Sequence, residues 1–221
     1  MAASPPHPPE SRRDWILRNL RERIAHGELP AGERLIERDI SVHYGISRGP
    51  VREAIMVLEQ EGLVITHPYR GAVVTEVSQK EIEEILVPIR LVIEKAAFRA
   101  AAETSDQQLF EALDVLVGQM ESAAAEPLDA KALADLDVAF HEAVITAAGH
   151  MQPLRIWRTI QPRVRAYFLR DAPHHENPHG VVDQHRSLLD ALRSGDPERI
   201  GGEIAEHIGI YLGTDDGERR G

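Results

Sequence analysis

Apolar residues recur at helical spacing through most of the chain after Ser78, and this pattern constrains the fold most strongly. The clearest stripe consists of Ile82, Ile85, Leu86, Ile89, Ile93 and Ala96. Residues three and four apart share one face of a helix, so the stripe predicts a helix over residues 80–103. Further helices are predicted near 106–124, 128–148, 151–171, 179–194 and 196–212. Six helices without a strand pattern between them predict an all-α antiparallel bundle.

The residues before this region predict a smaller domain of another type. Apolar residues recur at helical spacing from Trp15 to Ile24, and a Gly/Pro turn follows at 27–32. A second short helix is expected to carry Ile36, Ile40 and Val42 on its apolar side. Gly45 ends that helix, and Ser47 is a suitable N-cap for the next one.

The third helix of this domain leads into a predicted β-hairpin. Its apolar stripe consists of Val51, Ala54, Ile55 and Leu58. Two β-prone runs follow, Leu63–Thr66 and Ala72–Val77, and the segment 67–71 joins them as a turn. This order of elements is typical of a winged helix-turn-helix, whose second helix enters the major groove of DNA.

Seven residues of this domain are candidates for contact with DNA. They are Arg38, Ser47, Arg48, Gly49, Arg52, Arg70 and Gly71. Arginine can clamp a phosphate or read guanine with its planar fork, and small residues let the helix backbone approach closely. A single arginine of this kind is more simply explained as part of a solvated face. The order of elements and the four arginines on one predicted surface favour DNA binding.

The net charge of −11 argues at first against a nucleic-acid partner, because a DNA-binding protein must neutralise phosphates. The charge is divided unevenly, however. Residues 1–78 hold 10 basic and 11 acidic residues, whereas residues 79–221 hold 15 and 25. We therefore predict a tail over 1–13, a DNA-binding domain over 14–78, a helical domain over 79–213 and a second tail over 214–221.

Composition excludes several other classes. The absence of cysteine rules out disulfide scaffolds, cysteine-ligated zinc and thiol catalysis. No apolar run approaches the ~18 residues that a transmembrane helix needs. The Pro-rich, polar start is not a secretory signal, so we expect a cytoplasmic protein with no membrane partner.

Polar residues interrupt the buried stripes of three predicted helices. Asp137 and His141 lie one helical turn apart, and His185 and His207 lie on the apolar stripes of two later helices. One such histidine is more simply a hydrogen-bonded core residue. Four inward ligand-type groups are harder to explain in that way, because burying each of them unpaired is costly. They offer a set of three nitrogens and one oxygen for Zn²⁺, Ni²⁺ or Mn²⁺.

Both parts of the chain resemble one family of bacterial regulators. The segments PAGERL, ERDIS, YGISRGPVREA and LEQEGLV and the Arg70-Gly71 wing resemble the DNA-binding domain of the GntR family. That family more often has Thr where this chain has Gly49. The D-x-x-x-H pattern, the segment HRSLLDALRSGD and a late His-Ile are similar to the family's FCD domain, in its shorter VanR-like form. The resemblance implies metal ligation by Asp137, His141, His185 and His207.

These observations lead to a functional hypothesis. We expect a homodimeric transcriptional repressor that binds a pseudo-palindromic double-stranded DNA operator and responds to a small carboxylate effector at the metal. Arg90 lies on a buried stripe and is a candidate effector ligand unless it pairs with Glu94 or reaches solvent; Arg163 and Arg165 are weaker candidates.

The sequence leaves three alternatives open for the helical domain. One is a metal-dependent enzyme fused to a DNA-binding domain, but no separate inward carboxylate is expected to serve as a general base. Another is a metal-free dimerisation module. The third is a metal site in the His-rich loop over 174–179, which is more simply a solvated loop.

Overall fold

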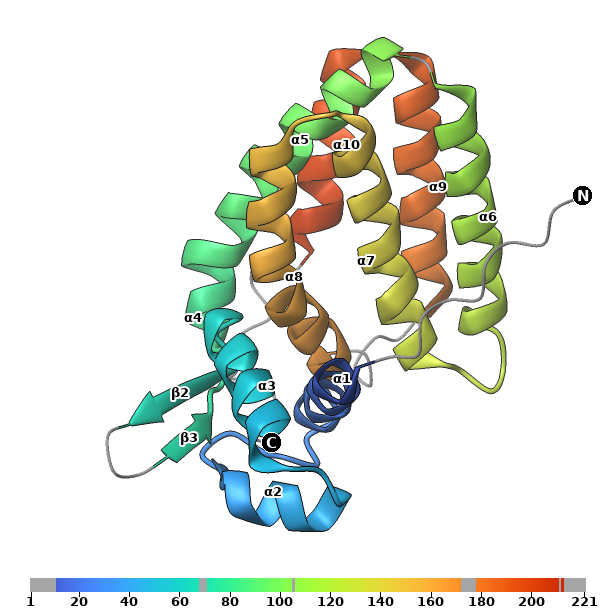
Figure 1. Ribbon diagram of the computed structural model, residues 1–221. Helices are drawn as coiled ribbons and strands as arrows, with labels where there is room; N and C mark the ends of the chain where they lie inside the picture. Colours follow the sequence, from blue (N-terminus) through green and yellow to red (C-terminus); the bar gives the residue numbers. More distant parts are fainter. Residues whose placement is uncertain (1–10, 68–70, 105, 172–177, 211, 213–221) are drawn as a thin grey trace, which may run out of the picture. The chain divides into compact units, whose positions relative to one another are not determined.

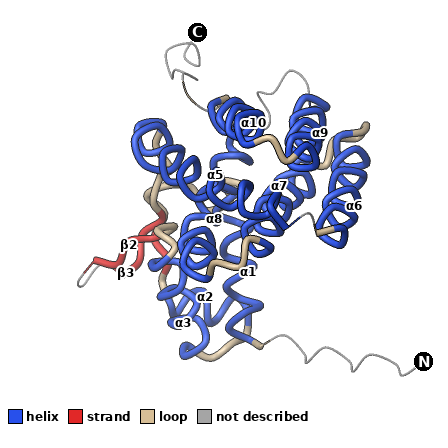
Figure 2. Tube along the Cα trace, turned by 90° about the horizontal axis from the view of Figure 1, so that it is seen from above, coloured by secondary structure: helices blue, strands red, loops and turns tan. Residues whose placement is uncertain are grey.

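The computed structural model describes residues 11–67, 71–104, 106–171, 178–210 and 212, and it divides into two compact units. The first unit extends to Glu76 and the second begins at Val77. Figure 1 colours the chain from blue at the N-terminus to red at the C-terminus, and Figure 2 shows the strands in red and the helices in blue.

Three helices and a small sheet make up the first unit. The helices are α1 (Arg12–Ala25), α2 (Glu37–Tyr44) and α3 (Arg48–Gln60), and the strands are β1 (Arg34–Leu35), β2 (Val64–His67) and β3 (Gly71–Val74). Helices α1 and α3 pack against each other. Their buried residues include Ile16 and Leu20 from α1 and Val51 and Leu58 from α3, so the predicted stripes form the core of this unit.

Local chemistry explains the helix boundaries at the turn between α2 and α3. Gly45 has a φ of 64° and ends α2 in the left-handed region that glycine favours. Ser47 is the N-cap residue of α3, as the sequence predicts, although its side chain makes no capping hydrogen bond. The prediction that α2 has a buried apolar side is wrong. No residue of α2 is buried, and Val42 and the preceding Ile36 are 77% and 47% exposed.

The wing is a three-stranded antiparallel sheet of order β1-β3-β2. Strand β3 pairs with β2 from His67↔Gly71 to Val64↔Val74, and its other edge pairs with β1 at Leu35↔Ala72. The predicted hairpin is present, but β3 ends at Val74 and not at Val77. The two-residue strand β1 was not predicted, because a segment this short carries no alternating pattern.

Helices dominate the second unit. They are α4 (Gln79–Glu81), the π-helical turn η1 (Ile82–Leu86), α5 (Val87–Thr104), α6 (Gln107–Ala124), α7 (Ala130–Ala147), α8 (Met151–Asp171), α9 (Pro178–Ser194) and α10 (Pro197–Gly209). The last six are the long ones among the described residues of this unit, and the bounds of α6 to α10 agree with the predicted ranges to within a few residues. The predicted helix over 80–103 is divided between α4, η1 and α5.

Capping residues set the starts of several of these helices. Asp106, Asp129 and Asp196 accept hydrogen bonds from the first-turn amides of α6, α7 and α10. Such caps satisfy amide groups that have no partner within the helix. Helix α5 packs against α7, α9 and α10, and α7 also packs against α6 and α8. Figure 2 shows α6, α9 and α10 side by side in this bundle.

Candidate metal centre and DNA-binding surface

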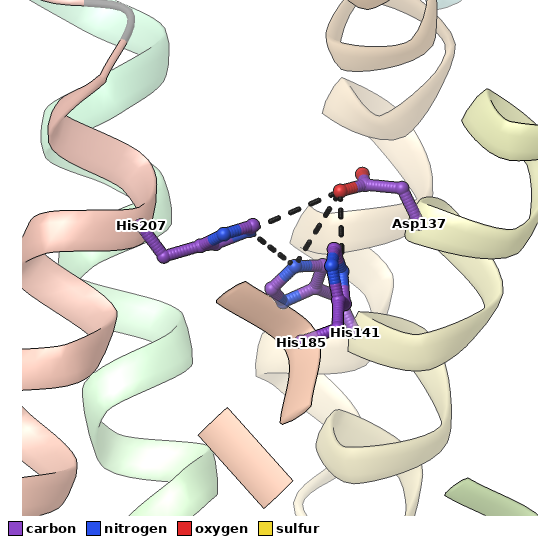
Figure 3. A group of neighbouring side chains, drawn as sticks. All are labelled: Asp137, His141, His185 and His207. Atoms are coloured by element: carbon purple, nitrogen blue, oxygen red, sulfur yellow. Dashed lines mark hydrogen bonds and ion pairs between the residues drawn. The ribbon is translucent and has the colours of Figure 1, made fainter. Parts of the chain in front are cut away.

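The four predicted ligands come together inside the helical unit. Helix α7 supplies Asp137 and His141, α9 supplies His185 and α10 supplies His207, and all four are buried. One ligand atom from each side chain lies within 4.8 Å of all the others. Figure 3 shows the three imidazole rings around one oxygen of Asp137.

The distances between the inward atoms fit a metal. Oδ1 of Asp137 lies 3.4 Å from Nε2 of His185 and 3.9 Å from Nε2 of both His141 and His207. Metal–ligand bonds near 2.1 Å place neighbouring ligand atoms about 3.0 Å apart in octahedral geometry and about 3.4 Å apart in tetrahedral geometry. Nε2 of His185 completes no hydrogen bond among the described residues, and this buried atom therefore needs another partner.

Hydrogen-bond acceptors outside the cluster orient the imidazole rings of His185 and His207. Nδ1 of His185 lies 2.8 Å from the carbonyl oxygen of Val181, and Nδ1 of His207 lies 3.1 Å from Oε1 of Gln184. Each of these acceptors assigns the ring proton to Nδ1 and leaves a lone pair on the inward Nε2. Metal-binding histidines are typically held by such outer acceptors.

His141 is held by a carboxylate. Its Nδ1 lies 2.7 Å from Oε2 of Glu94, which is fully buried on α5. Nε2 of His141 lies 3.0 Å from Nε2 of His207. If both rings carry their proton on Nδ1, two lone pairs face each other at this distance, and a cation between them would remove the repulsion.

Electrostatics favour the ligand forms of Asp137 and His207. Burial by itself raises the pKa of Asp137, but the nearby His185, His141 and Arg90 outweigh it and lower the pKa to about 2. Burial, followed by the neighbouring His185 and His141, lowers the pKa of His207 well below its usual value. Asp137 is therefore ionised and His207 neutral near pH 7, as metal binding requires.

The expectation that no separate carboxylate points inward is wrong. Glu94 is buried and binds both His141 and Arg90, whose Nε donates to Oε1 at 2.7 Å. Burial raises the pKa of Glu94, but Arg90 and His141 outweigh this effect and lower it to about 2. The signal was available in the sequence, because Glu94 lies one turn beyond Arg90 on the same helix face.

The three candidate effector arginines have different surroundings. Arg90 is 1% exposed and donates to Glu94 and, from Nη1, to the hydroxyl of Tyr167 at 2.6 Å. It pairs with Glu94 and does not reach solvent. Arg163 forms an ion pair with Glu81. The weaker candidate Arg165 forms one with Asp135.

The DNA-contact candidates lie mainly on exposed positions of the first unit. Ser47, Arg48, Gly49 and Arg52 are exposed at the start of α3. Arg52 donates through Nε and Nη2 to the carboxylate of Glu37 at 2.8 and 2.9 Å. This pair joins the start of α2 to the first turns of α3.

The remaining candidates lie outside α3. Arg38 is exposed on α2, and its Nε lies 3.1 Å from Oδ1 of Asp39. Gly71 begins β3 with a φ of 78°. Arg70 lies outside the described residues, as does most of the His-rich segment 174–179.

Comparisons with known proteins identify the family. Residues 13–74 match the family described as bacterial regulatory proteins, gntR family, and residues 85–209 match the FCD domain. The chain belongs to the GntR family. A protein of Paenarthrobacter nicotinovorans named "Probable D-xylose utilization operon transcriptional repressor" is 32% identical, over 90% of this chain and 85% of its own length.

Two further comparisons agree with this assignment. The "Gluconate operon transcriptional repressor" of Bacillus subtilis is 30% identical, over 82% of this chain and 75% of its own length. The structure of E. coli McbR/YncC has the same fold, with a TM-score of 0.76, 23% identity and coverage of 92% and 96% of the two chains. This GntR-family chain is thus a DNA-binding transcriptional regulator with an FCD domain and not an enzyme.

No helix among the described residues is both long enough and apolar enough to cross a membrane.

Proposed function

We propose that the protein is a cytoplasmic homodimeric repressor whose operator binding is controlled by a small organic acid at a divalent metal. The residues Asp137, His141, His185 and His207 would hold the metal, with Zn²⁺, Ni²⁺ and Mn²⁺ as the candidates. The observation that carries the proposal is the convergence of three imidazole Nε2 atoms and one carboxylate oxygen in a buried site. The outer contacts of the histidines support it.

A metal held in five- or six-coordinate geometry by these four ligand atoms would keep open coordination positions for a carboxylate. The chain's own residues hold those ligands in place: Glu94 and Gln184 orient His141 and His207 from outside the cluster. An effector changes operator affinity only if it binds the DNA-bound and DNA-free states with different affinity. Relatives named as repressors support the repressor assignment.

DNA binding itself would use Arg38, Ser47, Arg48, Gly49, Arg52, Arg70 and Gly71. A dimer places two recognition helices about one DNA turn apart, so its operator is pseudo-palindromic. A modest number of arginines, doubled by dimerisation, supplies the phosphate contacts, since the first part of the chain is nearly neutral.

The test combines metal analysis with selection of DNA from a random pool. Purified protein should contain close to one transition-metal ion per chain, and the selected DNA should contain two inverted half-sites. A panel of small carboxylates should then weaken the gel shift of the selected site with metal-loaded protein only. Protein that contains no metal after mild purification, or whose operator affinity is the same with and without metal and acids, would contradict the proposal.

A further inference from the structure

We propose that Glu37 is a positioning residue, which holds Arg52 so that the free edge of its guanidinium group reads a guanine in the operator. The inference rests on the proposed function, in which α3 contacts DNA, and makes it more specific. It assigns a role in DNA recognition to a residue of α2. It also assigns Arg52 to a base and not to a phosphate.

The contact between these two residues fixes one edge of the guanidinium group. Nε and Nη2 of Arg52 donate to Oε1 and Oε2 of Glu37 at 2.8 and 2.9 Å, so the pair is bidentate. Two parallel hydrogen bonds hold a planar guanidinium group in one orientation. Because Glu37 begins α2 and Arg52 lies one turn into α3, the orientation of Arg52 is set by a second helix.

The other edge of Arg52 remains available for DNA. Nη1 and the second hydrogen of Nη2 form another fork, at the end of the side chain. Nη1 of Arg52 makes no hydrogen bond within the described part of the chain, and the residue is exposed. This end-on fork has the two parallel donors that O6 and N7 of guanine accept in the major groove.

The local charges favour a base over a phosphate as the partner of this fork. The hydrogen bond from Arg52 lowers the pKa of Glu37, so the carboxylate is ionised near pH 7 and offsets the charge of Arg52. A phosphate at Arg52 would also meet the negative charge of Glu37, whereas guanine offers neutral acceptors. Arg48, one turn earlier on α3, has no such carboxylate partner among the described residues.

The exposure of the pair separates its role in recognition from stability. The side chains of Arg52 and Glu37 are 64% and 33% exposed, and exposed ion pairs contribute little to the free energy of unfolding. Glu37→Gln should therefore fold like the wild type. It removes the charged acceptor of the side-on fork, so Arg52 is no longer held in one orientation and loses its choice of base.

The first test identifies the guanine and the groove from which it is read. DNA selected from a random pool by the full-length protein supplies the operator, and each guanine of a half-site is replaced in turn. 7-Deazaguanine lacks the N7 acceptor of the major groove, whereas inosine lacks only the amino group in the minor groove. At one guanine, 7-deazaguanine should lower affinity about tenfold or more and inosine should leave it unchanged. In Arg52→Ala this penalty should disappear, which assigns the guanine to Arg52.

The second test asks whether Glu37 controls this discrimination. Glu37→Gln should reduce the penalty for 7-deazaguanine from about tenfold to about threefold or less. Arg52→Lys keeps the positive charge but removes the fork, so it should lose the same discrimination. The matched control is Asp39→Asn, which removes a carboxylate beside Arg38 on the same helix and leaves the pair of Glu37 and Arg52 intact. It should keep the discrimination of the wild type.

Three results would overturn the inference alone. In the first, no guanine has a penalty that depends on Arg52, and Arg52→Ala weakens binding to all DNA equally with a salt slope reduced by about one, as loss of a phosphate contact requires. In the second, Glu37→Gln keeps the discrimination of the wild type, whatever its overall affinity for DNA. In the third, Arg52→Lys keeps the discrimination of the wild type.

Failure of the proposed function has a different appearance. Operator affinity would then be unchanged in both Arg48→Ala and Arg52→Ala, because α3 would not contact DNA. In that case the inference falls with the proposed function. The thermal stability of each variant is measured beside its affinity, so that a loss of folding is not mistaken for a loss of recognition.

Discussion

Nδ1 of His141 lies 2.7 Å from Oε2 of Glu94 in the interior of the helical unit, and Oε1 of the same carboxylate accepts from Arg90. Glu94 thus joins a buried cation to a candidate metal ligand. Such a carboxylate fixes the ring orientation and increases the basicity of the histidine.

The role of Glu94 predicts the effect of removing its charge. Glu94→Gln should lower metal affinity about 10–100-fold, because His141 loses its charged outer partner. It should also reduce the free energy of unfolding by about 3 kcal/mol or more, because Arg90 stays buried without its ion pair. Metal titration and urea unfolding measure the two effects. The control is Glu142→Gln, which breaks the more exposed pair with Arg158 and should cost only about 0–1 kcal/mol.

The low pKa of Glu94 predicts a dependence of stability on pH. Its pKa is about 2 in the folded protein, below the ordinary value of 4.5. A carboxyl group whose pKa is lowered by folding stabilises the folded state at pH values above its ordinary pKa. This contribution disappears as the pH falls toward the folded-state pKa of about 2. The stability difference between metal-free wild type and Glu94→Gln should stay constant from neutral pH down to 4.5 and narrow below it. A difference that grows in acid would show that Glu94 is not held as a carboxylate.

A variant that lacks one of the four metal-binding side chains should lose metal, while the first unit should still bind DNA. His207→Ala should lower the metal content and the effector response, because one of the four inward atoms is gone. The isolated N-terminal domain should still bind DNA weakly. The matched control is His43→Ala, which changes an exposed histidine of the first unit. Full metal occupancy in His207→Ala would remove His207 from the site.

The exposed arginines of α3 predict a separation of DNA binding from ligand binding. Arg48→Ala and Arg52→Ala should each weaken operator binding and leave the binding of metal and carboxylate unchanged. If an arginine neutralises a phosphate, its removal should reduce the slope of log affinity against log salt by about one. Gel shifts at several salt concentrations measure this slope. Unchanged affinity in both variants would contradict the assignment of α3 as the recognition helix.

Gly49 gives a sharper test of how closely α3 approaches DNA. A Cβ at this helical position meets no atom within 4 Å, and its φ is not in the left-handed region. Gly49→Ala should therefore stabilise the protein by roughly 0.5–1 kcal/mol, because alanine loses less backbone entropy in a helix. If the backbone needs close approach to DNA, operator affinity should nevertheless fall.

The control for this change lies in the other unit. A Cβ at Gly118, within α6, also meets nothing within 4 Å. Gly118→Ala should raise the thermal stability of the protein and leave operator affinity unchanged. Equal operator affinity for Gly49→Ala and the wild type would show that Gly49 does not lie against the DNA.

The sequence alone determined the type and order of the long helices and of the hairpin, although not β1 or η1, because helical spacing, glycine at turns and a serine cap act over a few residues. It therefore placed α3, the hairpin and the long helices of the second unit. It also indicated Asp137, His141, His185 and His207, since a polar residue on an apolar stripe is visible without any knowledge of its neighbours.

Only the tertiary structure decided which of these residues meet. The fold brings α7, α9 and α10 together so that four ligand atoms lie within 4.8 Å, and it buries Glu94 between Arg90 and His141. It also left Val42 exposed where local spacing predicted an apolar side, and it left Nε1 of Trp157 without an acceptor among the described residues. Burial and contact depend on residues far apart in the chain, and local periodicity carries no information about those partners.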